Sequence, residues 1–277
     1  MTGWWGSNLD VLDGGPAWAF SVRPDLWGPG WTVTTMDPED ALAEWFATAH
    51  AVACSSGTSA VHLALLALGI GAADEVMVAA TAPVMTALPV LAVGATPVFV
   101  DVAHPRTFAL DAEDVERKLT PRTRVVIAVP MWGYPADDRV LARTCTEHGL
   151  ALIEDAAQAH GTVTDGRLAG TGVTIGTFST HARKIMTTGE GGFCLTDDDD
   201  LDEHLRQLRN LGRHPGGGPF GARFGLNVKL PALTAALGTV QLQRLRSRIQ
   251  HRLRTLQALT VLAREVPGLV PFPVPER

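Results

Sequence analysis

The sequence predicts an α/β protein built around a mainly parallel sheet, and two observations support this. Short apolar segments typical of strands alternate along the chain with longer amphipathic segments typical of helices. The 277 residues are 46% hydrophobic and 19% charged, which allows a substantial core and excludes a disordered chain.

The alternation of expected helices and strands begins in the first part of the chain. Pro38, followed by acidic residues, predicts the start of a helix over 38–49. A short strand over 50–56 leads into a second helix over 58–70, which opens on small polar residues. An apolar segment, 74–80, is the second expected strand.

The middle of the chain continues the pattern. The apolar segment 82–94 predicts a helix that is kinked or broken at Pro89. A strand is expected over 96–102, a helix with an acidic start over 111–120, and a strand over 124–131.

The last elements of the main domain are mostly strands. A helix over 137–149 ends at a glycine, and strands follow over 150–156, 176–180 and 191–197. The acidic run at 196–200 is interpreted as the N-cap cluster of a further helix.

Three regions are expected along the chain. Residues 1–36 form an arm that holds five of the seven tryptophans, and it packs either on its own domain or on another subunit. Residues 37–230 form the major domain. Residues 231–277 form a connecting helix, over 232–266, and a proline-rich stub.

Charge and composition exclude several classes of protein. The formal charge is −6, which is not the footprint of a nucleic-acid binder. The arginines of 243–254 are interpreted as a solvated or subunit-facing helix surface. There is no signal peptide and no apolar run of membrane-spanning length, so we expect a cytoplasmic protein.

The cysteines indicate no metal and no disulfide framework. Cys54, Cys145 and Cys194 are far apart and form no CxxC pair. We expect each to be a buried small hydrophobic side chain, and we expect no metal site.

The segment 178–192, FSTHARKIMTTGEGG, raises the possibility of amine chemistry. Its one lysine, Lys184, stands near a glycine-rich stretch, which suggests that something approaches the backbone closely. A lysine amine becomes a catalyst when it forms a Schiff base with a carbonyl group. His181 and Arg183 flank it; a nearby cation would favour the neutral amine, although both side chains could face solvent. A lone lysine is by default a surface residue.

Two further segments place polar groups at the ends of strands. The helix start at 55–59 offers amides and the hydroxyls of Thr58 and Ser59 to a phosphate, although the segment taken alone favours an ordinary helix cap. Asp155 ends the strand 150–156, where α/β sheets bind ligands, and could hold a pyridinium nitrogen or cap the next helix. Glu154 points to the opposite side and is expected to be structural.

The order of these groups is more specific than any one of them. A phosphate cup, an acid at a strand end and a lysine in a glycine-rich loop, with Ser179 as a second phosphate donor, fit an aldehyde cofactor with a phosphate and a protonatable ring nitrogen. Pyridoxal 5′-phosphate (PLP) has these features.

Most of the chain between about residues 40 and 250 resembles the DegT/DnrJ/StrS family of PLP-dependent sugar aminotransferases, of the aspartate aminotransferase-like fold type I. The similar stretches are SSGTSAVHLALLALGIG (55–71), GATPVFVDV (94–102), VIAVPMWGYPAD (126–137), LIEDAAQAHG (152–161), FSTHARKIMTTGEGG (178–192) and NVKLPALTAALGTVQLQRL (227–245). The resemblance implies a three-layer α/β/α major domain, over 37–230, that binds PLP.

The resemblance also implies roles around the cofactor ring. Lys184 forms the Schiff base and then moves the proton between cofactor and substrate carbons. Asp155 pairs with the ring nitrogen, and Gln158 lies beside the ring and contacts its hydroxyl group.

The cofactor phosphate has its own set of implied partners. Gly57, Thr58, Ser59 and Ser179 hold it from one chain, and Asn227 reaches it from the neighbouring subunit. The resemblance therefore implies a dimer.

The sequence departs from the family pattern at three places. Pro83 stands where the family stacks an aromatic residue on the cofactor ring, which puts cofactor affinity in question. A stretch like GYNYR reads GLNVK here, so both tyrosines are lost and the arginine becomes Lys229. The chain stops at Arg277, so the C-terminal small domain is expected to be truncated.

The implied function is transfer of an amino group from glutamate or glutamine to a keto sugar nucleotide or keto-cyclitol, in secondary-metabolite or surface-sugar biosynthesis. The alternative is a non-catalytic or partial subunit of a heteromeric aminotransferase. A third possibility is an elimination or other carbanion step on the same cofactor. Lys184 argues against the relatives that carry histidine there and dehydrate their substrates.

Overall fold

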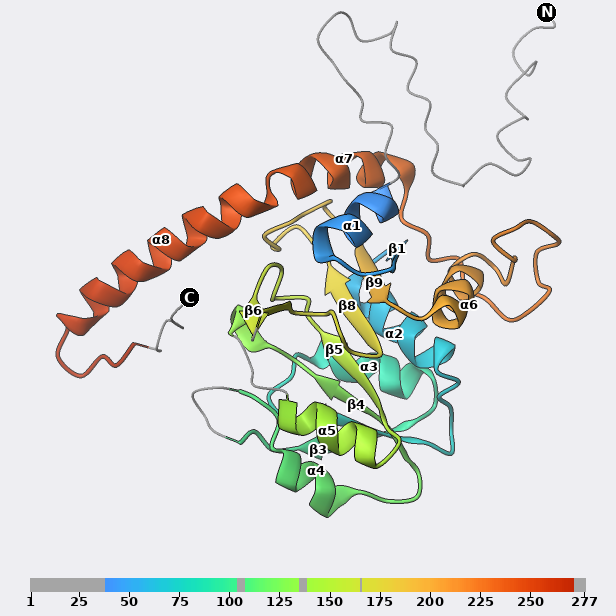
Figure 1. The fold of residues 1–277 in the computed structure, drawn as a ribbon, viewed down its shortest axis with the longest axis horizontal. Coiled ribbons are helices and arrows are strands. Elements are labelled where there is room, and N and C mark those ends of the chain that lie inside the picture. Colours follow the sequence, from blue (N-terminus) through green and yellow to red (C-terminus); the bar gives the residue numbers. More distant parts are fainter. Residues whose placement is uncertain (1–37, 104–107, 135–138, 165, 272–277) are drawn as a thin grey trace, which may run out of the picture.

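The computed structural model describes residues 38–103, 108–134, 139–164 and 166–271. The tryptophan-rich arm at 1–36 lies outside the described residues, as does the end of the proline-rich stub. Figure 1 shows a sheet covered by helices on both faces, which confirms the predicted three-layer α/β/α architecture.

One seven-stranded sheet forms the centre of the protein, in the order β1-β9-β8-β5-β4-β2-β3. Only β9 runs antiparallel to its neighbours, so the sheet is mainly parallel, as predicted. The strands are β1 (His50–Cys54), β2 (Glu75–Ala79), β3 (Thr96–Val100), β4 (Thr123–Ala128), β5 (Ala151–Asp155), β8 (Ile175–Ser179) and β9 (Gly192–Thr196).

The two faces of the sheet carry different helices. Val76 and Val78 of β2 pack into the cluster of one helical layer, whereas Met77 and Ala79 pack into that of the other. This alternation follows from the two-residue period of a strand. The first layer holds α2 (Gly57–Ala67), α3 (Val84–Ala92) and α6 (Asp199–Arg209), and the second holds α1 (Pro38–Phe46), α4 (Ala112–Lys118) and α5 (Arg139–Glu147).

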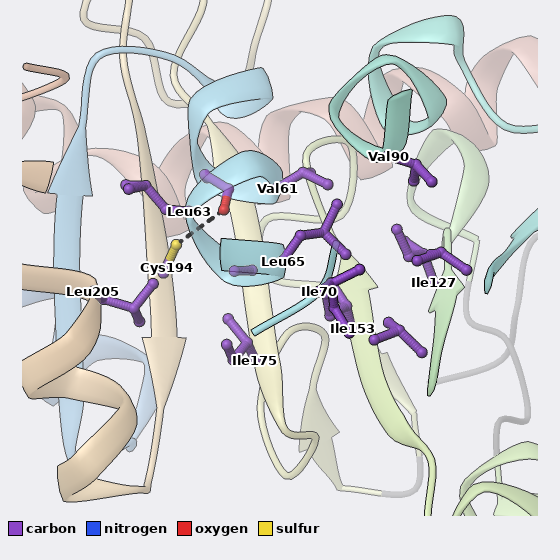
Figure 2. Packing of buried hydrophobic residues seen from close by; sticks show 14 of the residues in the cluster. Val61, Leu63, Leu65, Ile70, Val90, Ile127, Ile153, Ile175, Cys194 and Leu205 are labelled. Atoms are coloured by element: carbon purple, nitrogen blue, oxygen red, sulfur yellow. Dashed lines mark hydrogen bonds between the residues drawn. The ribbon is translucent and has the colours of Figure 1, made fainter. Parts of the chain in front are cut away.

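Helix α2 occupies the middle of the first layer and is apolar on most of its surface. Figure 2 shows its Val61, Leu63 and Leu65 among the buried side chains of the sheet. The Cys194 thiol donates to the Ala60 carbonyl at 3.4 Å. All three cysteines are buried, as predicted. This packing fixes the start of α2 at one edge of the sheet.

Three details differ from the sequence prediction. The long helix after Pro231 is two helices, α7 (Ala232–Gln243) and α8 (Leu245–Arg264), and Figure 1 shows α8 leaving the body of the protein. Helix α3 (Val84–Ala92) includes Pro89, so the break that was one of the two alternatives there is absent. A small two-stranded sheet, β6 (Val163–Thr164) and β7 (Arg167–Leu168), was not predicted. Within the described ranges, no helix has both the length and the apolar character needed to cross a membrane.

Candidate active site

A cleft of about 770 Å³ lies where the carboxyl ends of the parallel strands meet. Its walls come from the start of α2 and from the segments that follow β2, β4, β5 and β8. The structure brings together seven of the predicted site residues there: Gly57, Thr58, Pro83, Asp155, Gln158, Ser179 and Lys184.

The start of α2 forms an anion-binding end of the cleft. Ser56 caps the helix, because its hydroxyl oxygen accepts from the Ser59 amide at 3.0 Å. The amides of Gly57 and Thr58 belong to the first turn, where no intrahelical acceptor exists, and both residues line the cleft. A Cβ on Gly57 would lie 2.6 Å from Cβ of Ser179, so only glycine lets the helix start this close to β8.

Ser59 is part of the cap rather than of the cleft wall. Its hydroxyl lies 2.9 Å from that of Ser56 and 3.0 Å from that of Ser55. Within 55–59, Ser56 and Ser59 therefore form the helix cap, whereas Gly57 and Thr58 line the cleft. The predicted contact of Ser59 with a phosphate stays a prediction.

Asp155 is buried at the end of β5 and is held by two donors. The Thr86 hydroxyl donates to one carboxylate oxygen at 2.6 Å, and the Ala157 amide donates to the other at 3.2 Å. Burial raises the pKa of Asp155, whereas these hydrogen bonds and the Lys184 charge oppose that rise. The neighbouring Glu154 faces the other way and pairs with Arg167 at 3.4 Å, as expected of a structural residue.

Lys184 is partly buried across the cleft. Burial lowers the pKa of its amine, the Asp155 carboxylate raises it, and the Arg183 cation lowers it further. The flanking cation therefore acts in the direction expected from the sequence. A lowered pKa increases the fraction of neutral, nucleophilic amine.

Gln158 is oriented by the turn that follows β4. The backbone amide of Trp132 donates to its side-chain oxygen at 2.9 Å, which leaves the amide nitrogen free to donate to a ligand. Trp132 itself is 62% exposed, lines the cleft, and has a left-handed backbone with a φ of 55°. An exposed ring on a strained backbone at a cleft is characteristic of a functional position.

His160 adds a buried polar atom to the cleft wall. The side chain is 5% exposed, and its Nε2 atom has no hydrogen-bond partner among the described residues. Burial lowers the pKa of His160 to about 3, and the charges of Lys184 and Arg252 contribute. The ring is therefore neutral at physiological pH and lies edge-on to Phe178, with centroids 5.1 Å apart.

The glycine-rich stretch near Lys184 has a structural explanation. A Cβ on Gly192 would lie 2.5 Å from the carbonyl oxygen of Ser56 and 2.6 Å from that of Phe178. At Gly192, the close approach is therefore made by the chain's own backbone. It brings β9 against both the α2 cap and β8.

Asn227 does not line this cleft. Its side-chain oxygen accepts from the Lys229 amine at 2.5 Å, and its backbone bridges to Asn210. The chain therefore does not bring Asn227 to its own phosphate-binding end, and a role toward a neighbouring subunit stays a prediction. Pro83 does line the cleft, at the position where an aromatic ring was expected.

Four residues of the cleft were missed by sequence reasoning. Trp132 lies shortly after the end of β4, which was the available signal, whereas Thr86 lies within α3, where no local pattern marks it. His160 stands in the same segment as Asp155, but a lone histidine gives no pattern. Arg252 is on α8, whose arginines were interpreted as solvated or subunit-facing.

The donor set fits a phosphorylated aldehyde with a basic ring nitrogen. Amides and hydroxyls at the start of α2 suit the phosphate, the Asp155 carboxylate suits a protonated ring nitrogen, and the Lys184 amine suits the aldehyde. The residues that the structure describes hold no cluster of histidine, cysteine and acidic side chains suited to a metal ion.

Comparison with known proteins also points to an aminotransferase. The model of the DegT/DnrJ/EryC1/StrS aminotransferase family matches residues 30–277. The chain is 40% identical over 218 residues to GDP-perosamine synthase of Caulobacter vibrioides, an alignment that covers 79% of this chain and 58% of that protein. It is 41% identical over 241 residues to L-glutamine:2-deoxy-scyllo-inosose aminotransferase of Streptomyces lividus, covering 83% and 56%.

The fold is shared with solved structures. NtdA from Bacillus subtilis, solved with the bound cofactor PMP, matches with a TM-score of 0.76 and 29% identity, over 82% of this chain and 52% of that one. The chain thus spans between half and two thirds of the length of these three relatives.

Proposed function

Because the chain belongs to the DegT/DnrJ/EryC1/StrS aminotransferase family, whose members depend on PLP, we propose that it is a PLP-dependent aminotransferase. One observation supports this most strongly: Lys184, Asp155 and the start of α2 line the same cleft. The residues 37–230 serve in this proposal as the cofactor-binding domain.

Each group of the chain has a distinct task in the reaction. When bound, PLP supplies a reactive aldehyde and an electron-accepting ring. The amides of Gly57 and Thr58, with the Ser179 hydroxyl, bind the phosphate at the positive end of the α2 dipole. The buried Asp155 carboxylate would favour the protonated form of the cofactor's ring nitrogen.

Lys184 and Gln158 act on the reacting side. The Lys184 amine, whose pKa is lowered by burial, would supply the nucleophile for the cofactor aldehyde and the base that takes and returns the proton of the substrate carbon. Gln158, whose side-chain oxygen accepts from the Trp132 amide, would donate its amide N–H to the hydroxyl group of the cofactor ring and help to orient the cofactor.

The substrates are proposed from the relatives. The amino donor is glutamate or glutamine, and the acceptor is a keto sugar nucleotide or a keto-cyclitol, used to build a secondary metabolite or a surface sugar. The names of the Caulobacter and Streptomyces relatives support one acceptor class each.

The active unit is proposed to be a homodimer in which Asn227 reaches the partner's phosphate. Asn227 is absent from its own cleft, which is consistent with this assignment. Mixing a Lys184→Ala chain with an Asn227→Ala chain tests it, since a mixed dimer would hold one intact site. Activity recovered on mixing supports the proposal, and no recovery contradicts it.

The absorption spectrum of the purified protein tests the main proposal. After loading with PLP and removal of excess, the wild type should show a visible band that bleaches with glutamate. Lys184→Ala and Lys184→Arg should lack the band and the activity while keeping the fold, because neither supplies a neutral amine. Full activity in Lys184→Ala would refute the proposal, and absence of the band in the wild type would favour a non-catalytic subunit.

A further inference from the structure

The buried ring of His160 has no task in the proposed reaction, although it lines the same cleft as Lys184. The side chain is 5% exposed, and its Nε2 atom has no hydrogen-bond partner among the described residues. A buried polar atom without a partner is costly, because it has lost its hydrogen bonds to water. Such an atom in a cleft wall indicates that its partner is a group that moves or binds there.

Two aromatic side chains and one backbone group fix the orientation of the His160 ring. The ring lies edge-on to Phe178, with centroids 5.1 Å apart, and to Phe193, with centroids 6.2 Å apart. A backbone hydrogen bond with Ser179 opposes the fall in the pKa of the ring, as a ring N–H that donates to a carbonyl oxygen does. Because Nε2 has no partner, the donor is Nδ1. Nε2 therefore carries the lone pair and is a hydrogen-bond acceptor.

The charged groups that act on this ring are Lys184 and Arg252. Burial, followed by the charges of Lys184 and Arg252, lowers the pKa of His160 to about 3. The ring is therefore a neutral acceptor, and both cations carry N–H donors. Lys184 has the larger effect of the two, and it lies on the loop that begins directly after Ser179.

Helix α8 packs against both the loop that carries the amine and the segment that carries the histidine. The Arg248 guanidinium donates to the Ile185 carbonyl at 3.0 Å, one residue from Lys184. A Cβ on Gly161, which follows the histidine, would collide with Ile249. Both backbones are therefore fixed by one helix, and the flexible stem of the lysine is the part that can move.

We propose that His160 is a positioning residue for Lys184, and that its Nε2 atom accepts an N–H of the free Lys184 amine. The proposal rests on the proposed function. The structure shows the amine in another rotamer, since Nε2 has no partner there, so the contact is made by rotation of the lysine side chain.

The contact would give the reaction an oriented base. An amine that donates one N–H to a neutral acceptor keeps its lone pair free to take a proton. The other groups that act on the Lys184 amine are the Asp155 carboxylate, which raises its pKa, and the Arg183 cation, which lowers it. A neutral ring favours the ammonium form less than a second carboxylate would, so the amine stays usable as a base.

Competitive acetylation of the cofactor-free chain with a trace of acetic anhydride tests the contact. The chain has only three lysines, so mass spectrometry resolves the label on each of them as the pH is varied. The dependence of the Lys184 label on pH gives the ratio of amine to ammonium at that residue. Lys118, which donates to the Asp114 carboxylate at 2.7 Å, reports in the same sample on whether the fold is intact.

Two variants separate the nitrogen from the ring. His160→Phe removes Nε2 but keeps a ring beside Phe178 and Phe193, whereas His160→Gln keeps an acceptor near the same position. A hydrogen bond is stronger when its donor is charged, so the contact favours the ammonium form. His160→Phe should therefore raise the ratio of amine to ammonium at Lys184 about fivefold, and His160→Gln should restore the wild-type ratio.

The outcomes of this comparison are distinct. Equal ratios in the wild type and His160→Phe would overturn the proposal. An equal change in His160→Phe and His160→Gln would assign the effect to packing and would also overturn it. A change in His160→Phe that His160→Gln restores supports it.

The nitrogen chemical shift of Nε2, measured by NMR, gives a second test that leaves His160 unchanged and so does not depend on the folding of its variants. Lys184→Met should change this shift, because the ring loses its donor, whereas Arg252→Gln should leave it as in the wild type. The opposite result would make Arg252 the partner of Nε2 and would overturn the proposal.

Failure of the proposed function gives a different signature. A wild-type chain that takes up no PLP would refute the aminotransferase proposal, while both measurements on the cofactor-free chain would still support or overturn the contact. In a loaded chain, His160→Phe should slow the bleaching of the visible band at saturating glutamate about tenfold, with the half-saturating concentration changed by less than about twofold. His160→Gln should restore the rate, and an unchanged rate in His160→Phe would overturn the positioning role.

Discussion

Replacing Asp155 with asparagine should stabilise the cofactor-free chain while abolishing tight cofactor binding. The side chain is buried, and burial raises the pKa of its carboxyl group even though Thr86 and Ala157 both donate to it. Each of those hydrogen bonds stabilises the charge by about 1.5–3 kcal/mol, whereas burying a carboxylate costs several kcal/mol. The direction of the pKa shift shows that the cost of burial is the larger effect.

The neutral amide avoids that cost and keeps both partners, since it can accept from the Ala157 amide and donate to the Thr86 hydroxyl. We expect a gain of about 1 kcal/mol at pH 7, which is a rise of roughly 2–4 °C in Tm for a chain of this size. Cofactor affinity should fall by roughly two to four orders of magnitude, because the ring nitrogen loses its buried partner.

The stability gained by Asp155→Asn should also depend on pH. Because the pKa of Asp155 is raised on folding, the folded chain holds a proton more tightly than the unfolded chain above the ordinary carboxyl pKa. The free energy of unfolding therefore falls as pH rises through that range. The stability difference between Asp155→Asn and wild type should be largest at neutral pH and should close under acidic conditions.

Thermal unfolding of the cofactor-free proteins at several pH values, together with PLP titration, measures both effects. Thr86→Val is the matched comparison, because it removes a donor and leaves the carboxylate buried. It should weaken PLP binding and also lower stability. An Asp155→Asn chain less stable than wild type at pH 7 would show that the hydrogen bonds outweigh burial, and would refute the reasoning.

Two further predictions concern the walls of the cleft. Gly57→Ala should lower the free energy of unfolding by about 1–3 kcal/mol and weaken PLP binding, because the new methyl group collides with Ser179. The control is Gly71→Ala, where a Cβ meets no atom within 4 Å. It should be nearly neutral in the same unfolding and titration measurements. His160→Gln should lose less stability than the wild type when the pH falls from 6.5 to 4. Folding lowers the pKa of His160 to about 3, so in the wild type the unfolded chain binds the proton first. The free energy of unfolding of the wild type should therefore fall by up to about 1.4 kcal/mol per pH unit more than that of the variant. An unchanged slope in His160→Gln would contradict the burial of a neutral ring.

The sequence was most informative where a residue follows a strand. Asp155 and Ser179 end β5 and β8, and the topology of a parallel sheet places such ends together. The resemblance to a family added Gln158 and Asn227, whose roles no local pattern indicates. Gln158 lines the same cleft as Asp155 and Asn227 does not, so the roles of both toward a cofactor stay predictions.

What the sequence did not reveal depends on contacts between distant segments. Thr86 is a buried threonine in an apolar helix, and only the folded chain shows that it donates to Asp155. The return of α8 to the Lys184 loop rests on the contact of Arg248 with Ile185. The break between α7 and α8 falls at Arg244, where neither proline nor glycine signals it.

The reversed strand β9 bears on the order in which the chain folds. Strands β8 and β9 are joined directly by residues 180–191, which include Lys184, so this hairpin forms by local pairing. The parallel pairs need longer loop closures, and closing such loops is slow. The loop that carries the amine can therefore take shape early, whereas the cup at the start of α2 is completed only when β9 pairs with the distant β1. We therefore expect ligand-binding competence to appear late on the folding pathway, which time-resolved cofactor binding during refolding would check.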